Sequence, residues 1–180
     1  MTCIVGLEHE GHIYIGGDSA SVSGWDIIQT RLKKVFRMGD FIIGYTSSFR
    51  MGQILQYNLD IEKQKDDIDD LRYMATIFIE SVRKSFGEGG YREIESERES
   101  GGFFLVGYKG KIYSIGDDFQ VNSSIDGFTS VGSGESYALG SLFETKGEAP
   151  FIRLEKALSA ASYFSGAVCP PFTIVSSKDM

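Results

Sequence analysis

Short apolar runs separated by polar turns mark the beginning of the chain as β-structure. Short apolar runs at 3–7 and 12–16 flank a polar turn that contains a glycine, which is the pattern of a hairpin. A second pair of runs, at 34–38 and 41–45, flanks Gly39-Asp40, a two-residue turn signal. The pattern therefore predicts two hairpins, and the first strand starts at the first residues of the chain.

The periodicity changes to that of a helix after these strands. Ser47 and Ser48 are both able to cap a helix, and the apolar residues behind them fall at helical spacing: Met51, Ile54 and Leu55. A longer helix is predicted at 69–86, where two aspartates precede a single apolar stripe. The charged, glycine-rich residues 87–102 are predicted to form a solvated loop.

The second half of the chain repeats the order of strands followed by helices. Strands are predicted at 103–108, 111–115, 119–122 and 128–131, helices at 135–144 and 151–164, and a last strand at 171–176. Two antiparallel sheets packed face to face, each covered by a pair of helices, bury every apolar face in this order. We therefore expect an α+β fold in a single domain over residues 1–180, whose 42% hydrophobic content suffices for a core.

Charge and hydropathy narrow the classes of partner. The formal net charge is −7 and the sequence has no basic stripe, which argues against nucleic acid as a partner. No apolar run approaches the roughly 20 residues that a membrane-spanning helix needs, and the start does not resemble a signal peptide. We expect a cytoplasmic protein with no membrane association.

The scarcity of histidine limits the chemistry. Only His9 and His12 are present, so a Ser-His-Asp triad would need one of these turn residues and is a minor alternative. Together with Cys3 and Cys169 they lack the spacing and number of a zinc site, and we expect no metal and no cofactor. The two cysteines are interpreted as small apolar residues rather than a disulfide.

A hydroxyl nucleophile that needs no histidine is available at the N-terminus. Removal of Met1 exposes Thr2 with both a hydroxyl and a free α-amine, whose unperturbed pKa is about 7.7–8.0. A large part of that amine is neutral near pH 7 and able to accept the hydroxyl proton. Nucleophile and base then belong to one residue.

Four motifs along the chain support this interpretation together. They are Thr2-Cys3-Ile4-Val5-Gly6, Gly16-Gly17-Asp18-Ser19, Lys34-Val35, and Gly132-Ser133-Gly134 followed by Tyr137-Ala138. In this order and at these separations they resemble the catalytic β-type subunits of the proteasome and the peptidase subunit of the bacterial HslUV protease. The resemblance spans nearly the whole chain and implies a four-layer αββα sandwich, the N-terminal-nucleophile hydrolase fold.

The resemblance also implies roles for individual residues. Thr2 is expected to be the nucleophile, Lys34 the cation beside it, Asp18 the ion-pair partner of Lys34, and Ser133 the hydrogen-bond partner of the Thr2 amine. Strand alternation independently favours Lys34 over Lys33, because Lys34 falls on the apolar face of its strand. A lysine on an apolar face needs such a carboxylate partner.

Two positions depart from the family pattern. The family has an aspartate followed three residues later by Ser-Gly, whereas this chain has Ser162 followed by Ser165-Gly166; Ser165 is therefore retained as a catalytic candidate without the aspartate. The oxyanion-hole glycine of the family corresponds to Ser47, whose backbone N–H is expected to serve instead.

The leading hypothesis is a threonine-type peptidase. It would act on peptides or unfolded protein, within a homo-oligomeric ring and with an ATPase unfoldase as partner, as the resemblance implies. A non-catalytic structural subunit with the same fold and a small-molecule amidase of the same superfamily stay open as alternatives.

Overall fold

Two antiparallel sheets form the centre of the molecule in the computed structural model, which describes residues 2–179. The first sheet has the strand order β12 (Phe128–Gly132), β1 (Cys3–His9), β2 (His12–Gly17) and β13 (Thr173–Ser176). The second has the order β11 (Val121–Asn122), β10 (Lys111–Ile115), β9 (Phe104–Tyr108), β6 (Phe41–Tyr45) and β5 (Val35–Met38).

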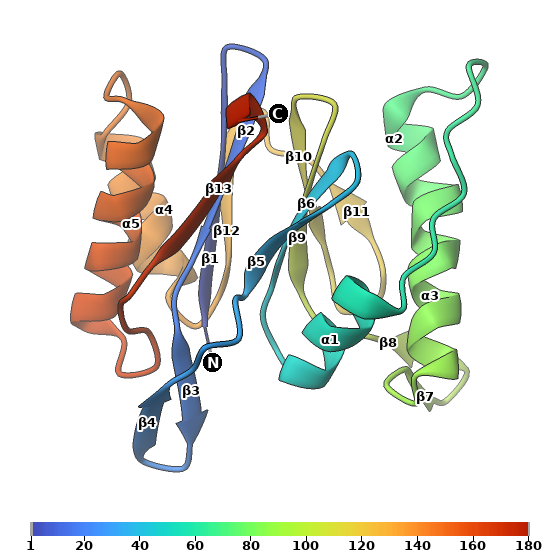
Figure 1. Cartoon of the computed structure of the whole chain (residues 1–180), viewed down its shortest axis with the longest axis horizontal. Helices are drawn as coiled ribbons and strands as arrows, with labels where there is room; N and C mark the ends of the chain where they lie inside the picture. The colour runs from blue at the N-terminus through green and yellow to red at the C-terminus, as the bar shows by residue number, and fades with distance from the viewer. Residues whose placement is uncertain (1, 180) are drawn as a thin grey trace.

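Helices cover the outer face of each sheet (Figure 1). The first sheet is covered by α4 (Glu135–Glu144) and α5 (Pro150–Phe164). The second is covered by α1 (Phe49–Tyr57) and by a continuous helical segment made of α2 (Asp70–Tyr73), the π-helical turn η1 (Met74–Phe78) and α3 (Ile79–Glu88). This arrangement confirms the predicted four-layer αββα sandwich.

The two sheets approach each other closely because glycines on one face admit isoleucines from the other. A Cβ at Gly44 would lie 2.5 Å from the Ile4 side chain, and a Cβ at Gly107 would lie 2.6 Å from that of Ile13. Both isoleucines are buried in the apolar cluster between the sheets. Side chains larger than hydrogen at these glycines would push the layers apart, because protein interiors are close-packed.

Two short hairpins were not predicted from the sequence. Strands β3 (Ala20–Ser23) and β4 (Asp26–Gln29) pair with each other and project from the sandwich beside the N-terminal end of the chain (Figure 1). Strands β7 (Glu93–Glu95) and β8 (Arg98–Ser100) pair within the segment that was expected to be a loop throughout. That loop prediction was wrong in its central part.

Within residues 2–179, no helix combines the length and the apolar character required to cross a bilayer. Cys3 and Cys169 are both free thiols. Burial raises the pKa of the Cys3 thiol to about 12, so this thiol is protonated and unreactive at neutral pH.

Candidate active site

The site begins where β1 and β12 meet. Cys3 pairs with Gly132 in the antiparallel register, and this places Thr2 beside Ser133, just beyond the paired strands. Gly132 has φ of +102°, and a Cβ there would lie 2.3 Å from the Thr2 carbonyl oxygen. Only glycine satisfies both conditions without displacing the start of β1.

Asp18 reaches the same place from the neighbouring strand β2, and Lys34 reaches it from the start of β5 in the second sheet. Ile4 pairs with Gly17, so Asp18 follows the end of β2 next to Thr2, and Lys34 immediately precedes β5. The Lys34 ammonium nitrogen Nζ lies 2.9 Å from Thr2 Oγ1 and 3.0 and 3.1 Å from the two carboxylate oxygens of Asp18. One ammonium thus bridges a hydroxyl and a carboxylate.

This ion pair is almost completely removed from solvent. The side chains of Lys34 and Asp18 are 2% and 0% exposed. Backbone N–H groups help to hold the carboxylate: Cys3 N donates to Asp18 Oδ1 at 3.0 Å and Ala20 N donates to Asp18 Oδ2 at 2.8 Å. Such bonds compensate part of the desolvation cost that a buried carboxylate bears.

Burial governs the acidity of the ammonium. The pKa of Lys34 is lowered from its usual value because desolvation disfavours the charged form, and the charge and hydrogen bonds of Asp18 offset this only in part. The nearest aromatic ring, that of Phe49, has its centroid 5.9 Å from Nζ, at the outer limit of a cation–π contact. Lys33, the alternative considered from the sequence, is exposed.

Ser133 contacts the main chain of Thr2 at two atoms. Thr2 N donates to Ser133 Oγ at 3.1 Å, and Ser133 Oγ donates to the Thr2 carbonyl at 3.2 Å. One hydroxyl can accept and donate at the same time, so the serine fixes the position of the Thr2 nitrogen. The expected removal of Met1 concerns a residue outside the described range.

A cleft of about 330 Å³ opens beside this cluster, lined by Thr2, Lys34, residues 20–22 and residues 45–50. Ser47 lies in its wall with a left-handed φ of 55°, a conformation that glycine adopts more readily. The Ser47 side chain supports this geometry, because its Oγ accepts a hydrogen bond from Phe103 N at 3.2 Å. Within residues 2–179 the Ser47 N–H donates to no protein acceptor, so it is available to a ligand in the cleft.

Ser165 is not brought into hydrogen-bonding contact with Thr2. It ends α5, where its Oγ accepts from Ala167 N at 3.4 Å and its carbonyl accepts from Val168 N at 3.2 Å. Its contacts among the described residues are therefore those of a helix-terminating turn, and its catalytic role stays a prediction.

Sequence reasoning missed the backbone donors that surround Asp18. Ala20 is the clearest case, because an aspartate that accepts from the N–H two residues later forms a common local turn. Asp18-Ser19-Ala20 carried that signal in the sequence. Among residues 2–179 no group of three or more His, Cys, Asp or Glu side chains is placed to hold a metal ion.

No protein-family model and no curated protein matches the sequence. Solved structures do match, among them BPH from Thiobacillus denitrificans in complex with epoxomicin, with a TM-score of 0.79 and 20% identity over 97% of both chains. HslV from Trypanosoma brucei matches with a TM-score of 0.67 and 16% identity, over 97% of this chain and 98% of that one.

A third similar structure is Anbu, described as an ancestral β-subunit, from Yersinia bercovieri. Its TM-score is 0.66 at 14% identity, over 97% of this chain and 81% of that one. All three are proteasome-type hydrolases. The chain has the proteasome-type N-terminal-nucleophile hydrolase fold. At these identities the likeness concerns the proteasome-type fold, and the chemistry is argued from the residues of this chain.

Proposed function

We propose that this chain is a threonine-type amide hydrolase that cleaves peptides or unfolded protein, with Thr2 as the nucleophile. The observation that carries the proposal is the 2.9 Å contact between Thr2 Oγ1 and the Nζ of a lysine that is itself buried against Asp18. A hydroxyl that accepts from a buried ammonium is stabilised as it develops negative charge.

In the first step Thr2 Oγ attacks the carbonyl carbon of the scissile amide. The Thr2 α-amine, free once Met1 is removed, accepts the hydroxyl proton, and Ser133 keeps that nitrogen in place. The carbonyl π-electrons move onto oxygen to give a tetrahedral intermediate. Ser47 lines the same cleft, and in this proposal its N–H donates to the oxyanion.

In the second step the C–N bond breaks and the leaving nitrogen takes the proton from the Thr2 ammonium. An ester then joins the acyl group to Thr2 Oγ. Water, deprotonated by the same amine, attacks this ester and restores the free hydroxyl. Lys34 stays protonated through the cycle, and its role is electrostatic.

The proposal extends to the assembly and its surroundings. The proposed assembly is a homo-oligomeric ring that encloses the site, for which the likeness to HslV and Anbu is the support. An ATPase unfoldase that delivers substrate and a cytoplasmic location are further parts of the proposal. A ring that hides Thr2 would restrict hydrolysis to chains that are already unfolded.

Intact-mass spectrometry before and after treatment with epoxomicin tests the nucleophile directly. We expect a protein without Met1 that gains one adduct, since the ketone of this epoxyketone takes the hydroxyl and its epoxide takes the amine. Thr2→Ser should keep the adduct and Thr2→Ala should lose it. Thr76→Ala, at an exposed helical threonine, is the matched control and should label like the unmodified protein.

An adduct that persists in Thr2→Ala rejects this nucleophile. A protein that keeps Met1 and takes no adduct would instead support the structural-subunit alternative, which the serine at position 162 favours because the family aspartate is missing. Turnover of small amides without turnover of fluorogenic peptides would favour the amidase alternative.

A further inference from the structure

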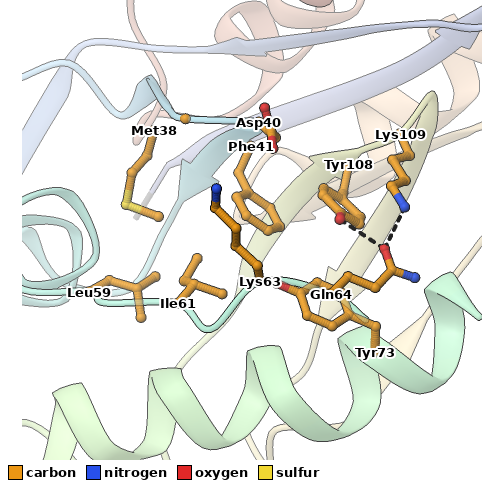
Figure 2. A pocket seen from close by; sticks show the side chains of 11 residues that line it. Met38, Asp40, Phe41, Leu59, Ile61, Lys63, Gln64, Tyr73, Tyr108 and Lys109 are labelled. Carbon is orange, nitrogen blue, oxygen red and sulfur yellow. Dashed lines mark hydrogen bonds between the residues drawn. The ribbon is translucent and has the colours of Figure 1, made fainter. Parts of the chain in front are cut away.

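A second cavity lies at the end of β5 opposite to the candidate active site. Lys34 precedes the start of β5, whereas the cavity opens at the turn that follows its end. The cavity has a volume of about 400 Å³ and is formed by the β5–β6 turn, the linker between α1 and α2, and the end of β9 (Figure 2). This volume lies within the range of small-molecule sites.

The floor of the cavity is aromatic and apolar. Phe41 and Tyr108 stack with ring centroids 4.5 Å apart, and Tyr73 lies 5.4 Å from Tyr108. The side walls are formed by Met38, Leu59 and Ile61, which are each only partly buried. Partly exposed apolar side chains around a concave aromatic floor favour a ligand with a large apolar group.

Two of the polar residues at the cavity are already occupied. Gln64 accepts hydrogen bonds from Tyr108 Oη at 2.9 Å and from Lys109 Nζ at 2.6 Å, as Figure 2 shows. Lys109 also pairs with Asp70 at 3.4 Å. Gln64, Lys109 and Asp70 therefore satisfy one another at one side of the cavity opening, and none of them has a charge left for a ligand.

Lys63 and Asp40 differ from them. Among residues 2–179 neither side chain forms an ion pair or a hydrogen bond with another protein group, although both line the cavity. Lys63 extends from the linker toward the β5–β6 turn (Figure 2). Asp40 directly precedes Phe41 of the aromatic floor, and its negative charge adds to burial in raising the pKa values of Tyr73 and Tyr108.

We propose that this cavity binds a free α-amino acid with a large apolar side chain, whose carboxylate pairs with Lys63, whose ammonium pairs with Asp40, and whose side chain packs on Phe41 and Tyr73. A zwitterion matches two unpaired charges of opposite sign. Both groups are exposed to solvent, so a simple anion would gain only the pair with Lys63 and a simple cation only the pair with Asp40, whereas a zwitterion gains both.

Saturation-transfer NMR on the full chain tests the proposal with four probes: L-phenylalanine, 3-phenylpropionate, phenethylamine and glycine. We expect saturable binding of L-phenylalanine, with the two singly charged analogues about threefold or more weaker, since each lacks one exposed ion pair. Glycine should not bind, because it lacks the apolar group. Equal affinity for phenylalanine and both analogues would overturn the proposal, as would the absence of saturable phenylalanine binding.

Variants assign the two charges. Lys63→Gln should weaken phenylalanine about threefold and remove its advantage over phenethylamine; Asp40→Asn should do the same with respect to 3-phenylpropionate. Lys65→Gln and Asp66→Asn, on the same linker but outside the cavity lining, are the matched controls and should bind like the unmodified chain. Equal effects in controls and variants would overturn the assignment.

A cavity-filling variant gives an independent readout. Ile61→Trp should block phenylalanine binding while circular dichroism and the thermal midpoint show that the chain is folded. Retained binding in folded Ile61→Trp would place the ligand elsewhere and overturn the proposal. None of these measurements depends on hydrolysis at Thr2, so they stand or fall separately from the proposed function.

Discussion

Two ion pairs in this molecule use similar groups in opposite environments. Lys34 and Asp18 are 2% and 0% exposed, whereas Arg83 and Glu99, which join α3 to β8, are 32% and 20% exposed. Both pairs have good hydrogen-bond geometry, with donor–acceptor distances of 3.0 and 2.6 Å. Geometry alone therefore does not separate a candidate catalytic pair from a surface contact.

The two ion pairs differ in the direction in which the pKa of the cation is shifted. The pKa of Lys34 is lowered because desolvation outweighs the attraction of Asp18. That of Arg83 is raised, chiefly by its hydrogen bond to Glu99 and then by that to Glu80. Burying the Lys34–Asp18 pair costs folding free energy, which indicates that the pair is retained for function rather than for stability. The partly solvated Arg83–Glu99 pair costs little to form and contributes little to stability.

The largest expected effect follows from breaking the buried pair. Asp18→Asn leaves the Lys34 ammonium buried without a compensating charge, and we expect the free energy of unfolding to fall by about 3–5 kcal/mol. Epoxomicin labelling at Thr2 should be lost as well, because the ammonium is no longer held at the threonine oxygen. Urea unfolding followed by circular dichroism measures the first effect and intact mass the second.

The double variant Asp18→Asn/Lys34→Met separates stability from chemistry. Replacing both charges removes the desolvation cost, so most of the lost stability should return while labelling stays absent. A single variant as stable as the unmodified protein would show that the pair is not buried as described. Labelling in the double variant would show that Lys34 has no part in activating Thr2.

Ser133→Ala is expected to have the next largest effect. It removes the oxygen that accepts from Thr2 N at 3.1 Å, and labelling or turnover should slow by about 100-fold, a typical contribution of a group that assists proton transfer. Stability should change little, because Ser133 is exposed. Ser165→Ala is the matched comparison; an equal loss there would support the role implied by family resemblance over the one implied by these contacts.

The sequence allowed a prediction of which side chains form the candidate site, but not of the backbone conformation that shapes it. Alternation favoured Lys34, and the ordered motifs favoured Asp18 and Ser133, which lie together with Thr2. Ser165, favoured by the same resemblance, makes its contacts in the turn that ends α5. The left-handed φ of Ser47 was not predictable, since it depends on a hydrogen bond from Phe103 N, a residue 56 positions away along the chain. Contacts of that kind appear only when distant strands have paired.

The strands of the fold also divide into those that the sequence predicted and those that it did not. Strands buried through most of their length, such as β1 and β9, are continuous apolar runs and were predicted. The β3–β4 hairpin lacks such a pattern because much of it faces solvent: Trp25 is fully exposed and Ile28 is 67% exposed. An apolar run reports burial, and it gives no signal for a strand pair whose residues are mostly exposed.

The lowered pKa of Lys34 predicts a modest pH dependence of stability. In the unfolded chain this lysine keeps its proton up to its usual pKa of 10.5, whereas the folded chain releases it at a lower pH. Between the two values the unfolded state binds more protons, so the stability contribution of this group rises with pH; below the lowered pKa its penalty is fully present. Urea unfolding measured from neutral to alkaline pH should therefore show the free energy of unfolding of the unmodified protein rising relative to that of Asp18→Asn/Lys34→Met. If the two free energies change in parallel with pH, the direction of the pKa shift is wrong.

The smallest effect is expected at the partly exposed pair of Arg83 and Glu99. Arg83→Gln removes the contacts with Glu99 and Glu80 but leaves every partner able to reach water, so the thermal midpoint should stay within about 3 °C of the unmodified protein. Epoxomicin labelling should keep its rate, since Arg83 lies on α3 and outside the cleft around Thr2. Differential scanning calorimetry and timed labelling provide the two readouts. A loss as large as that of Asp18→Asn would mean that solvent exposure does not distinguish the two pairs, and the contrast between them would have to be explained by something other than burial.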